Sequence, residues 1–86
     1  TQPIRAFILI RTIPGTSQQI VKSRRIRGVK MASSVYGQYD AVVVVEAKDL
    51  EEIARIVYEL VAQHPNVLHT ETLISTFPPG TAEPSD

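Results

Sequence analysis

Two segments of this chain are apolar on both faces, and they limit its fold more than any other feature does. The segments "IRAFILIRT" (Ile4–Thr12) and "AVVVVEA" (Ala41–Ala47) are rich in Ile and Val, without the polar alternation of a strand that has one face in water. Pro14 and Gly15 follow the first segment and break it. Each segment therefore predicts a central strand of a sheet that is covered on both sides.

The length and composition of the chain set further limits. A single domain of 86 residues buries only about 60 to 65 % of the surface that its unfolded chain exposes, which favours oligomerisation. The absence of cysteine excludes disulfides, thiol catalysis and thiolate metal sites. A net charge of zero gives no overall attraction to nucleic acid or membranes, and no apolar run approaches the roughly 18 residues of a membrane span. We expect a cytoplasmic protein without a cofactor, a metal, or a nucleic-acid or membrane partner.

A helix and a strand are predicted between the two central segments. Thr16 with Gln19 three residues later has the form of a capping box, which predicts a helix from residue 16 to about residue 27. Gly28 ends this helix. Residues 29–36 alternate weakly and favour a β-strand, so a hairpin leads into the second central strand.

The second half of the chain predicts another helix and a last strand. Asp49 with Glu52 repeats the capping signal, and Pro65 marks the end of the helix. "VLHTETLIST" (67–76) is typical of a fourth strand. Apolar residues at intervals of three, four and seven predict the buried stripe of the helix: Leu50, Ile53, Ala54, Val57, Leu60 and Val61.

The order strand, helix, strand, strand, helix, strand predicts a ferredoxin-like α+β fold (βαββαβ). Two right-handed crossovers around a central hairpin place both helices on one face of a four-stranded antiparallel sheet. We expect this domain at residues 1–77 and a flexible C-terminal tail at residues 78–86, which are rich in Pro and small polar residues. The face without helices would expose several hundred Å² of hydrocarbon in a monomer, so a second subunit should cover it sheet to sheet, as in dimeric α+β barrels.

The turn between the second and third strands, "YGQYD" at 36–40, carries more chemistry than a hairpin needs. Asp40 is an ionised acceptor, and Gly37 lets backbone N–H groups approach a carboxylate closely. Thr70 and Thr72 point to one side of the last strand and offer hydroxyl groups. Such a set could bind the ammonium and carboxylate of a free amino acid. The alternative is purely structural: Asp40 closes the turn and the tyrosines pack at the sheet edge.

The chain resembles the effector-binding domain of the Lrp/AsnC transcription regulators, the RAM domain (regulation of amino acid metabolism). The resemblance covers residues 4–76 and rests on the order of the elements, "RGVKMASSVYGQYDAVVVVEAKDLEE" and "NVLHTETLIST". Its most specific parts are the Tyr-Gly-x-Tyr-Asp turn and the Thr-x-Thr of the last strand. Family members usually carry an N-terminal helix-turn-helix domain, and nothing in this sequence could form one, so we expect a stand-alone form.

The resemblance implies an amino-acid sensing and oligomerisation module, not an enzyme, that modulates Lrp/AsnC-type transcription regulation without binding DNA itself. It implies homodimers that assemble into an octamer-like ring, with the effector pocket between dimers. Full-length Lrp/AsnC regulators are a further candidate partner. The effector-binding residues that it implies are Gly37, Gln38, Tyr39, Asp40, Thr70 and Thr72.

Two other functions remain open at this point. Small dimeric α+β-barrel enzymes, such as cofactor-free monooxygenases and isomerases, share this element order, but they normally aim a His, Asn or Trp into a cavity between helices and sheet. The chain has no Trp, and its two histidines flank the start of the last strand. A helix-lined cavity with His69 pointing inward would favour the enzyme. The other alternative is an adaptor that joins full-length regulators and binds no ligand.

The remaining charged residues have simpler interpretations. Five of the nine Lys and Arg lie within residues 22–30, which we interpret as a solvated helix C-terminus or a subunit contact rather than a nucleic-acid patch. His64 and His69 are five residues apart without a third ligand at a recognisable spacing, so both are predicted to be surface histidines. Glu71 points to the face of its strand opposite the two threonines, and we expect it to pair with an arginine.

Overall fold

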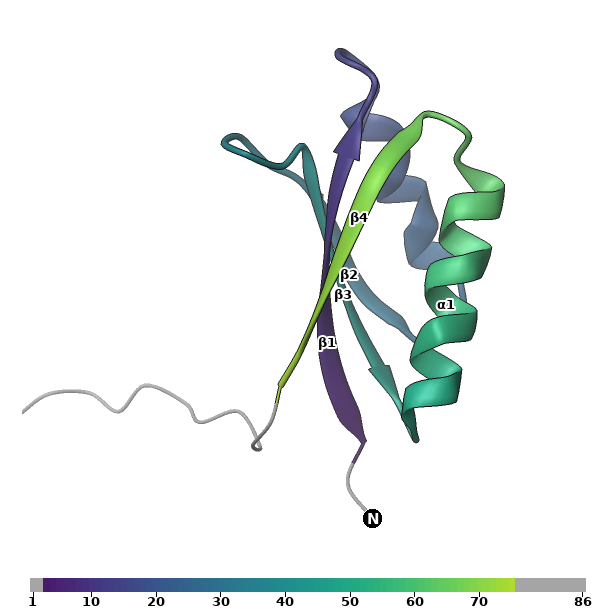
Figure 1. Ribbon diagram of the computed structural model, residues 1–86. Coiled ribbons are helices and arrows are strands. Elements are labelled where there is room, and N and C mark those ends of the chain that lie inside the picture. Colours follow the sequence, from purple (N-terminus) through teal and green to yellow (C-terminus); the bar gives the residue numbers. More distant parts are fainter. Residues whose placement is uncertain (1–2, 76–86) are drawn as a thin grey trace, which may run out of the picture.

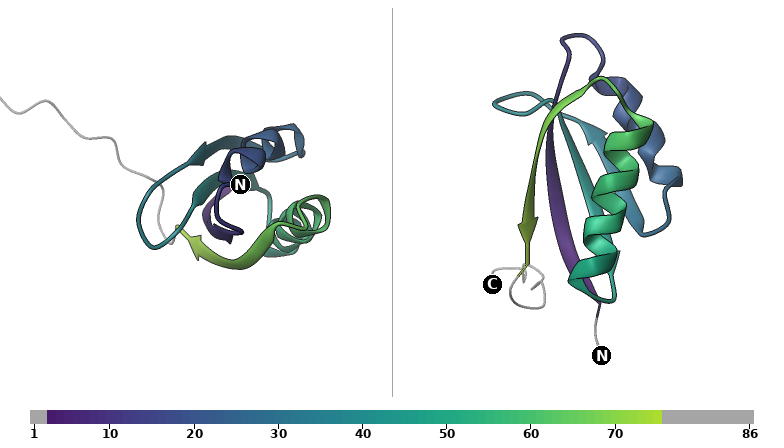
Figure 2. Two further views of the ribbon diagram at one scale, coloured as in Figure 1. Left: turned by 90° about the horizontal axis from the view of Figure 1, so that it is seen from above. Right: turned by 45° about the vertical axis from the view of Figure 1, so that its right-hand side comes forward.

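The computed structural model describes residues 3–75. The elements along this part of the chain are β1 (Ile4–Thr12), η1 (Ser17–Arg25), β2 (Val29–Ser34), β3 (Ala41–Ala47), α1 (Leu50–Gln63) and β4 (Val67–Ile74). The strands form one antiparallel sheet in the order β2-β3-β1-β4, with η1 and α1 on the same side of it (Figures 1 and 2). This arrangement confirms the predicted ferredoxin-like fold. The predicted tail at 78–86 lies outside the described residues.

The hydrophobic core lies between the helices and one side of the two central strands. Fully burying one Ile or Leu side chain contributes about 1.5 to 3 kcal/mol, and most of the largest core residues have no exposed surface. The core includes Ala6, Ile8, Ile10, Ala41, Val43 and Val45 from the sheet and Ile20, Ile53, Ile56 and Leu60 from the helices. None of the helices within residues 3–75 is long and apolar enough to cross a membrane.

The other side of the sheet, here called the open face, is apolar but not covered in the single chain. Phe7 lies opposite Val44 on β3 and opposite Leu73 on β4, so these side chains share that side. The exposed fractions of Phe7, Met31 and Leu73 are 37, 53 and 48 %. Only one side of the two apolar strands is therefore buried within the monomer, and the other side is left for a partner.

The first helix differs from its prediction. It is a 3₁₀ helix over Ser17–Arg25 instead of a helix over 16–27, and Thr16 does not cap it through its side chain. The Thr16 hydroxyl instead donates to the carbonyl oxygen of Ile13 at 2.6 Å. The burial pattern explains the helix type: Ile20, Ser23 and Ile26 are buried at intervals of three, and a 3₁₀ helix aligns residues three apart on one face.

The second helix begins as predicted but buries a different face. Oδ1 of Asp49 accepts a hydrogen bond from the backbone N–H of Glu52 at 2.9 Å, which confirms the N-cap. The buried residues of α1 are Ile53, Ile56 and Leu60. The predicted stripe omitted Ile56 and included Leu50 and Val61, whose exposed fractions are 57 and 41 %.

A close contact between α1 and the start of β2 explains this rotation of the helix. A Cβ atom on Gly28 would lie 2.6 Å from Cδ1 of Ile56, and only the glycine, at φ +99°, lets the side chain approach so closely. With Ile56 turned toward Gly28, the flank of α1 that carries Leu50, Ala54 and Val61 is left exposed.

The strand ends also differ slightly from the predicted ranges. β2 stops at Ser34 rather than residue 36, and β4 stops at Ile74 rather than residue 76, which is not described. The connection between β2 and β3 is closed by a hydrogen bond from the N–H of Val35 to the carbonyl oxygen of Asp40 at 2.9 Å. This turn projects from the sheet on the side away from α1 (Figure 1).

Candidate functional site

Asp40 ties the β2–β3 turn to the end of β1. Its backbone N–H donates to the carbonyl oxygen of Ile10 at 2.8 Å, and its Oδ2 accepts the backbone N–H of Thr12 at 2.9 Å. A hydrogen bond to an ionised carboxylate is roughly twice as strong as one between neutral groups, so this contact holds the turn in place. Oδ1 accepts no hydrogen bond from the residues that the structure describes and keeps its acceptor capacity.

Tyr39 connects the same turn to β4. Its hydroxyl group donates to Oε2 of Glu71 at 2.5 Å. This hydrogen bond raises the pKa of Tyr39, with smaller contributions from desolvation and from the negative charge of Glu71. Glu71 lies opposite Leu9 on the open face. The expectation that Glu71 pairs with an arginine is therefore wrong: its hydrogen-bond partner is a tyrosine from the turn.

Arg11 and His69 complete an open pocket beside the turn. They are direct partners in the β1–β4 register, which puts both side chains on the open face. Nε of Arg11 donates to the carbonyl oxygen of Gln38 at 2.7 Å. Arg11, Gln38, Tyr39 and His69 line the pocket, whose volume is about 370 Å³. Volumes of roughly 300 to 1,000 Å³ are typical of small-molecule sites.

The six predicted site residues do not all meet within one chain. Gln38 and Tyr39 line the pocket, and Asp40 lies between the turn and β1. Thr70 and Thr72 lie opposite Ile10 and Ile8, which face the helices, so their side chains are on the reverse side of β4.

Gly37 lies in the exposed turn at φ +126°, with open space where a Cβ would stand. Its positive φ, rather than a close approach of another group, explains the glycine.

Three residues at or beside the pocket were not among the predicted site residues: Arg11, His69 and Glu71. Each is an ordinary charged or polar residue in its own segment, and no local motif marks it. The pairing of β1 with β4 brings Arg11 beside His69, and that register includes a shift between Arg11 and Thr12. Only a correct alignment of the two strands could have identified this group from the sequence.

The two histidines occupy different environments. His69 is exposed on the open face, as predicted, and lies outside the space between helices and sheet. His64 was predicted at the surface, but its exposed fraction is only 8 % and its Nε2 has no hydrogen-bond partner among residues 3–75. Burial lowers the pKa of His64, and the positive charge of Lys22 lowers it further. The part of the chain that the structure describes contains no group of side chains that could hold a metal ion.

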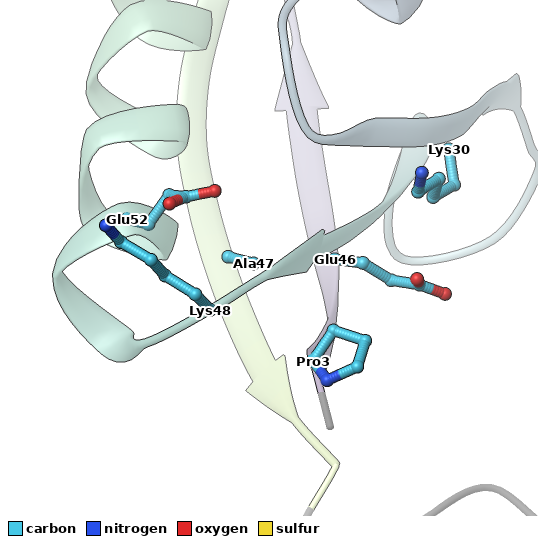
Figure 3. A pocket seen from close by; sticks show the side chains of 6 residues that line it. All are labelled: Pro3, Lys30, Glu46, Ala47, Lys48 and Glu52. Carbon is cyan, nitrogen blue, oxygen red and sulfur yellow. The ribbon is translucent and has the colours of Figure 1, made fainter. Parts of the chain in front are cut away.

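A second open pocket lies at the opposite end of the sheet. It has a volume of about 340 Å³ and is lined by Pro3, Lys30, Glu46, Ala47, Lys48 and Glu52. Its charged side chains spread to both sides of Ala47 instead of converging on one point (Figure 3). Glu46 is already paired with Arg5, whose Nη2 is 2.6 Å from Oε2.

The basic residues of η1 lie outside the pocket beside the turn. The last turn of η1 carries Lys22, Arg24 and Arg25. None of them forms an ion pair within the described range. These positions fit the interpretation of a solvated helix C-terminus, where positive charge meets the negative end of the helix dipole.

Comparisons with known proteins agree on one family. Residues 5–77 match the Lrp/AsnC ligand binding domain. The hypothetical protein PHS023 from Pyrococcus horikoshii is similar with 32 % identity and a TM-score of 0.76, over 87 % of this chain and 92 % of that chain. TTHA0845 from Thermus thermophilus has the same identity and TM-score over 95 % of this chain and 99 % of that chain. A search of curated proteins found no match.

A longer protein has the same fold. E. coli AsnC aligns with a TM-score of 0.79 and 17 % identity over 93 % of this chain. At this identity the likeness shows the fold alone. The aligned region is 55 % of the AsnC chain, so the present chain spans about half the length of that protein.

Proposed function

Because this chain belongs to the Lrp/AsnC ligand-binding domain family, we propose that it is a regulatory domain that senses a free amino acid and changes its assembly in response. It acts in the cytoplasm on Lrp/AsnC-type transcription regulation, binds no DNA itself, and takes full-length regulators of the family as further partners. The observation that carries this proposal is the pocket beside the β2–β3 turn, a space of ligand size that is lined by hydrogen-bond donors. Two carboxylates belong to the same region, because Glu71 accepts a hydrogen bond from the pocket residue Tyr39 and Asp40 follows Tyr39 in the turn.

The turn supplies the groups that a free amino acid needs. Oδ1 of Asp40 is an ionised acceptor for the ammonium group, and the turn at Gly37 and Gln38 exposes backbone groups to the ligand. Thr70 and Thr72 face away from this pocket in their own chain. This orientation supports an effector site shared between subunits, in which the two threonines contact the effector of a neighbouring subunit.

Two exposed apolar surfaces support assembly in two steps. The apolar part of the open face, around Phe7, Met31 and Leu73, pairs two copies sheet to sheet, because soluble monomers rarely leave a continuous apolar patch in water. The pocket of Arg11 and His69 lies at the turn end of the same face, beside this apolar part. The second surface lies on the opposite side, where Tyr58 and Val61 of α1 and Leu68 and Ile74 of β4 have exposed fractions between 41 and 76 %. Contacts through this second surface join dimers into a ring of octamer type.

Calorimetry against the twenty amino acids, run beside light scattering, tests the proposal. We expect one or a few amino acids to bind and the protein to be dimeric or larger, with an interface of roughly 1,200 to 2,000 Å² in each dimer. Replacing Leu73 by Lys, on the open face, should shift the protein toward monomers. A wild-type monomer at micromolar concentration, or no binding of any amino acid, would contradict the proposal.

One observation favours a second candidate function. Asp40 already accepts the N–H of Thr12, so the aspartate has a structural role whether or not a ligand binds. If no amino acid binds but full-length regulators do, the chain is a ligand-free adaptor.

A further inference from the structure

The geometry points to Arg11 as the residue that binds the carboxylate of the ligand, with the imidazole of His69 as a second hydrogen-bond donor beside it. This inference rests on the proposed function and deepens it, because it assigns one end of the ligand to named side chains. It also defines the class of ligand: a small molecule with a free carboxylate.

Arg11 is held in place but keeps most of its hydrogen-bonding capacity. The bond from Nε to the carbonyl oxygen of Gln38 orients the guanidinium group toward the pocket. Its two terminal nitrogens have no hydrogen-bond partner among residues 3–75, and the residue is exposed. A guanidinium group presents its donors in a planar fork that matches a carboxylate with two parallel hydrogen bonds.

The charge of Arg11 is not balanced by a direct ion pair. Its bonded partner is a neutral carbonyl, whereas Arg5 and Arg55 are paired with Glu46 and Glu59 at 2.6 and 2.7 Å. The nearby carboxylate of Glu71 is bonded to the hydroxyl of Tyr39 instead. Arg11 is therefore an oriented arginine in a pocket whose positive charge is still available to an anion.

His69 extends the same donor surface. It is the direct partner of Arg11 across the two strands, on the same face and in the same pocket. An imidazole N–H can donate to the second oxygen of a carboxylate held by the guanidinium. The acceptors for the ammonium group of such a ligand are then the carboxylates of Glu71, which is bonded to the pocket residue Tyr39, and of Asp40, which follows Tyr39 in the turn.

Binding of an acid and of its neutral carboxamide tests the inference directly. The probes are the twenty amino acids, the carboxamide of the tightest binder, and propionate, each measured by calorimetry. Arg11→Gln removes the charged fork, and Arg24→Gln is the matched control because Arg24 is an exposed arginine on η1. Arg11→Lys keeps the charge without the fork and serves in place of Arg11→Gln if that variant does not fold by circular dichroism.

We expect the wild type to prefer the acid over its carboxamide by at least about tenfold, the range of a charge-assisted hydrogen bond. Arg11→Gln should abolish this preference while binding the carboxamide as the wild type does, and Arg24→Gln should behave as the wild type. Arg11→Lys should keep part of the preference, and His69→Gln should reduce it less than Arg11→Gln does.

The other outcomes separate the inference from the proposed function. If amino acids bind and Arg11→Gln leaves their affinity unchanged, or weakens acid and carboxamide equally, or if Arg11→Lys keeps the full preference, the carboxylate role of Arg11 is overturned and the sensing function stands. If only propionate binds, and Arg11→Gln abolishes it, the carboxylate role stands and amino-acid sensing fails. If the wild type binds none of the probes, both fail.

Discussion

The two ends of the sheet carry pockets of similar volume, about 370 and 340 Å³, whose charged groups differ in what they are already bonded to. At the turn end, the guanidinium of Arg11 contacts a neutral carbonyl and keeps free donors. At the other end, Oε2 of Glu46 accepts hydrogen bonds from Nε and Nη2 of Arg5 at 3.2 and 2.6 Å. The unpaired charge of Arg11, rather than volume, therefore distinguishes the candidate site from a hollow whose Glu46 is already neutralised by Arg5.

Charge balance sharpens the same contrast. The second pocket combines Lys30 and Lys48 with Glu46 and Glu52, and these side chains spread over both sides of Ala47 (Figure 3). A balanced and dispersed set of charges gives a ligand no single point of attachment. At the turn end the groups come from three segments, β1, the turn and β4, and surround one space. The two ends should therefore differ in function as they differ in geometry.

The largest effect is expected for Asp40→Asn at the turn end. Removing the charge that accepts the ligand ammonium should lower effector affinity by roughly 10 to 150-fold, the value of a charge-assisted hydrogen bond. The melting temperature should change little, since the Asn carbonyl can still accept the N–H of Thr12. Calorimetry and thermal melts check both points. Glu46→Gln, the same kind of charge removal at the other end of the sheet, is the control. Equal losses of effector affinity in the two variants would show that the two pockets do not differ in ligand binding.

A smaller effect is expected for Thr72→Val on the reverse side of β4. Val is close to Thr in shape and keeps the β preference, and the loss of one neutral hydrogen bond should weaken effector binding by roughly 2 to 12-fold. Ser17→Ala, which removes a hydroxyl at the start of η1, should leave the affinity unchanged. If the Thr72→Val protein is fully assembled and binds the effector with wild-type affinity, the hydroxyl group of Thr72 does not contact the effector.

Acidification should lower the stability of the folded chain through His64, the C-cap residue of α1. Burial lowers the pKa of His64 in the folded state, so the unfolded chain binds more protons below the ordinary value of about 6.5. The stability contribution is therefore complete above about pH 6.5 and is lost as the pH falls from there toward the lowered pKa. Between pH 7.5 and pH 5, the melting temperature should fall by about a few degrees, the size expected for one titrating group. This pH dependence should diminish in His64→Gln but persist in His69→Gln.

The smallest effect is expected for Glu46→Gln on stability. This substitution breaks the ion pair between Glu46 and Arg5, whose exposed side-chain fractions are 24 % for Glu46 and 38 % for Arg5. Partly exposed ion pairs contribute only about 0 to 1 kcal/mol to stability. Denaturant unfolding should show a change within this range, and effector affinity should match that of the wild type. A measurable loss of effector binding would mean that the second pocket also takes part in ligand recognition.

Much of the fold could be predicted from local patterns. The bounds of β1 and β3 match the predicted ranges because a strand buried in the middle of a sheet is apolar along its whole length. The N-cap of α1 was also predictable, since Asp49 and Glu52 are only three residues apart. The type of η1 was not, because the choice of a 3₁₀ helix depends on how Ile20, Ser23 and Ile26 meet the sheet.

The candidate site could be predicted only in part. The turn at 36–40 is a contiguous motif, and two of its residues, Gln38 and Tyr39, line the pocket. The rotation of α1 toward Gly28 and the separation of Thr72 from the turn depend on packing between segments far apart in the sequence.

By itself, the sequence determined the order of the elements, the apolar open face and the turn that carries the candidate site. These features depend on the period of apolar residues and on turn chemistry, which act over a few residues. Only the tertiary structure decided that Arg11 stands beside His69, that Tyr39 reaches Glu71, and that the groups at the turn end line one space while those of the other pocket are dispersed. The physical reason is that strand register and side-chain pairing are set by all the packed segments together, and a shift of one residue would turn each of these side chains to the other face.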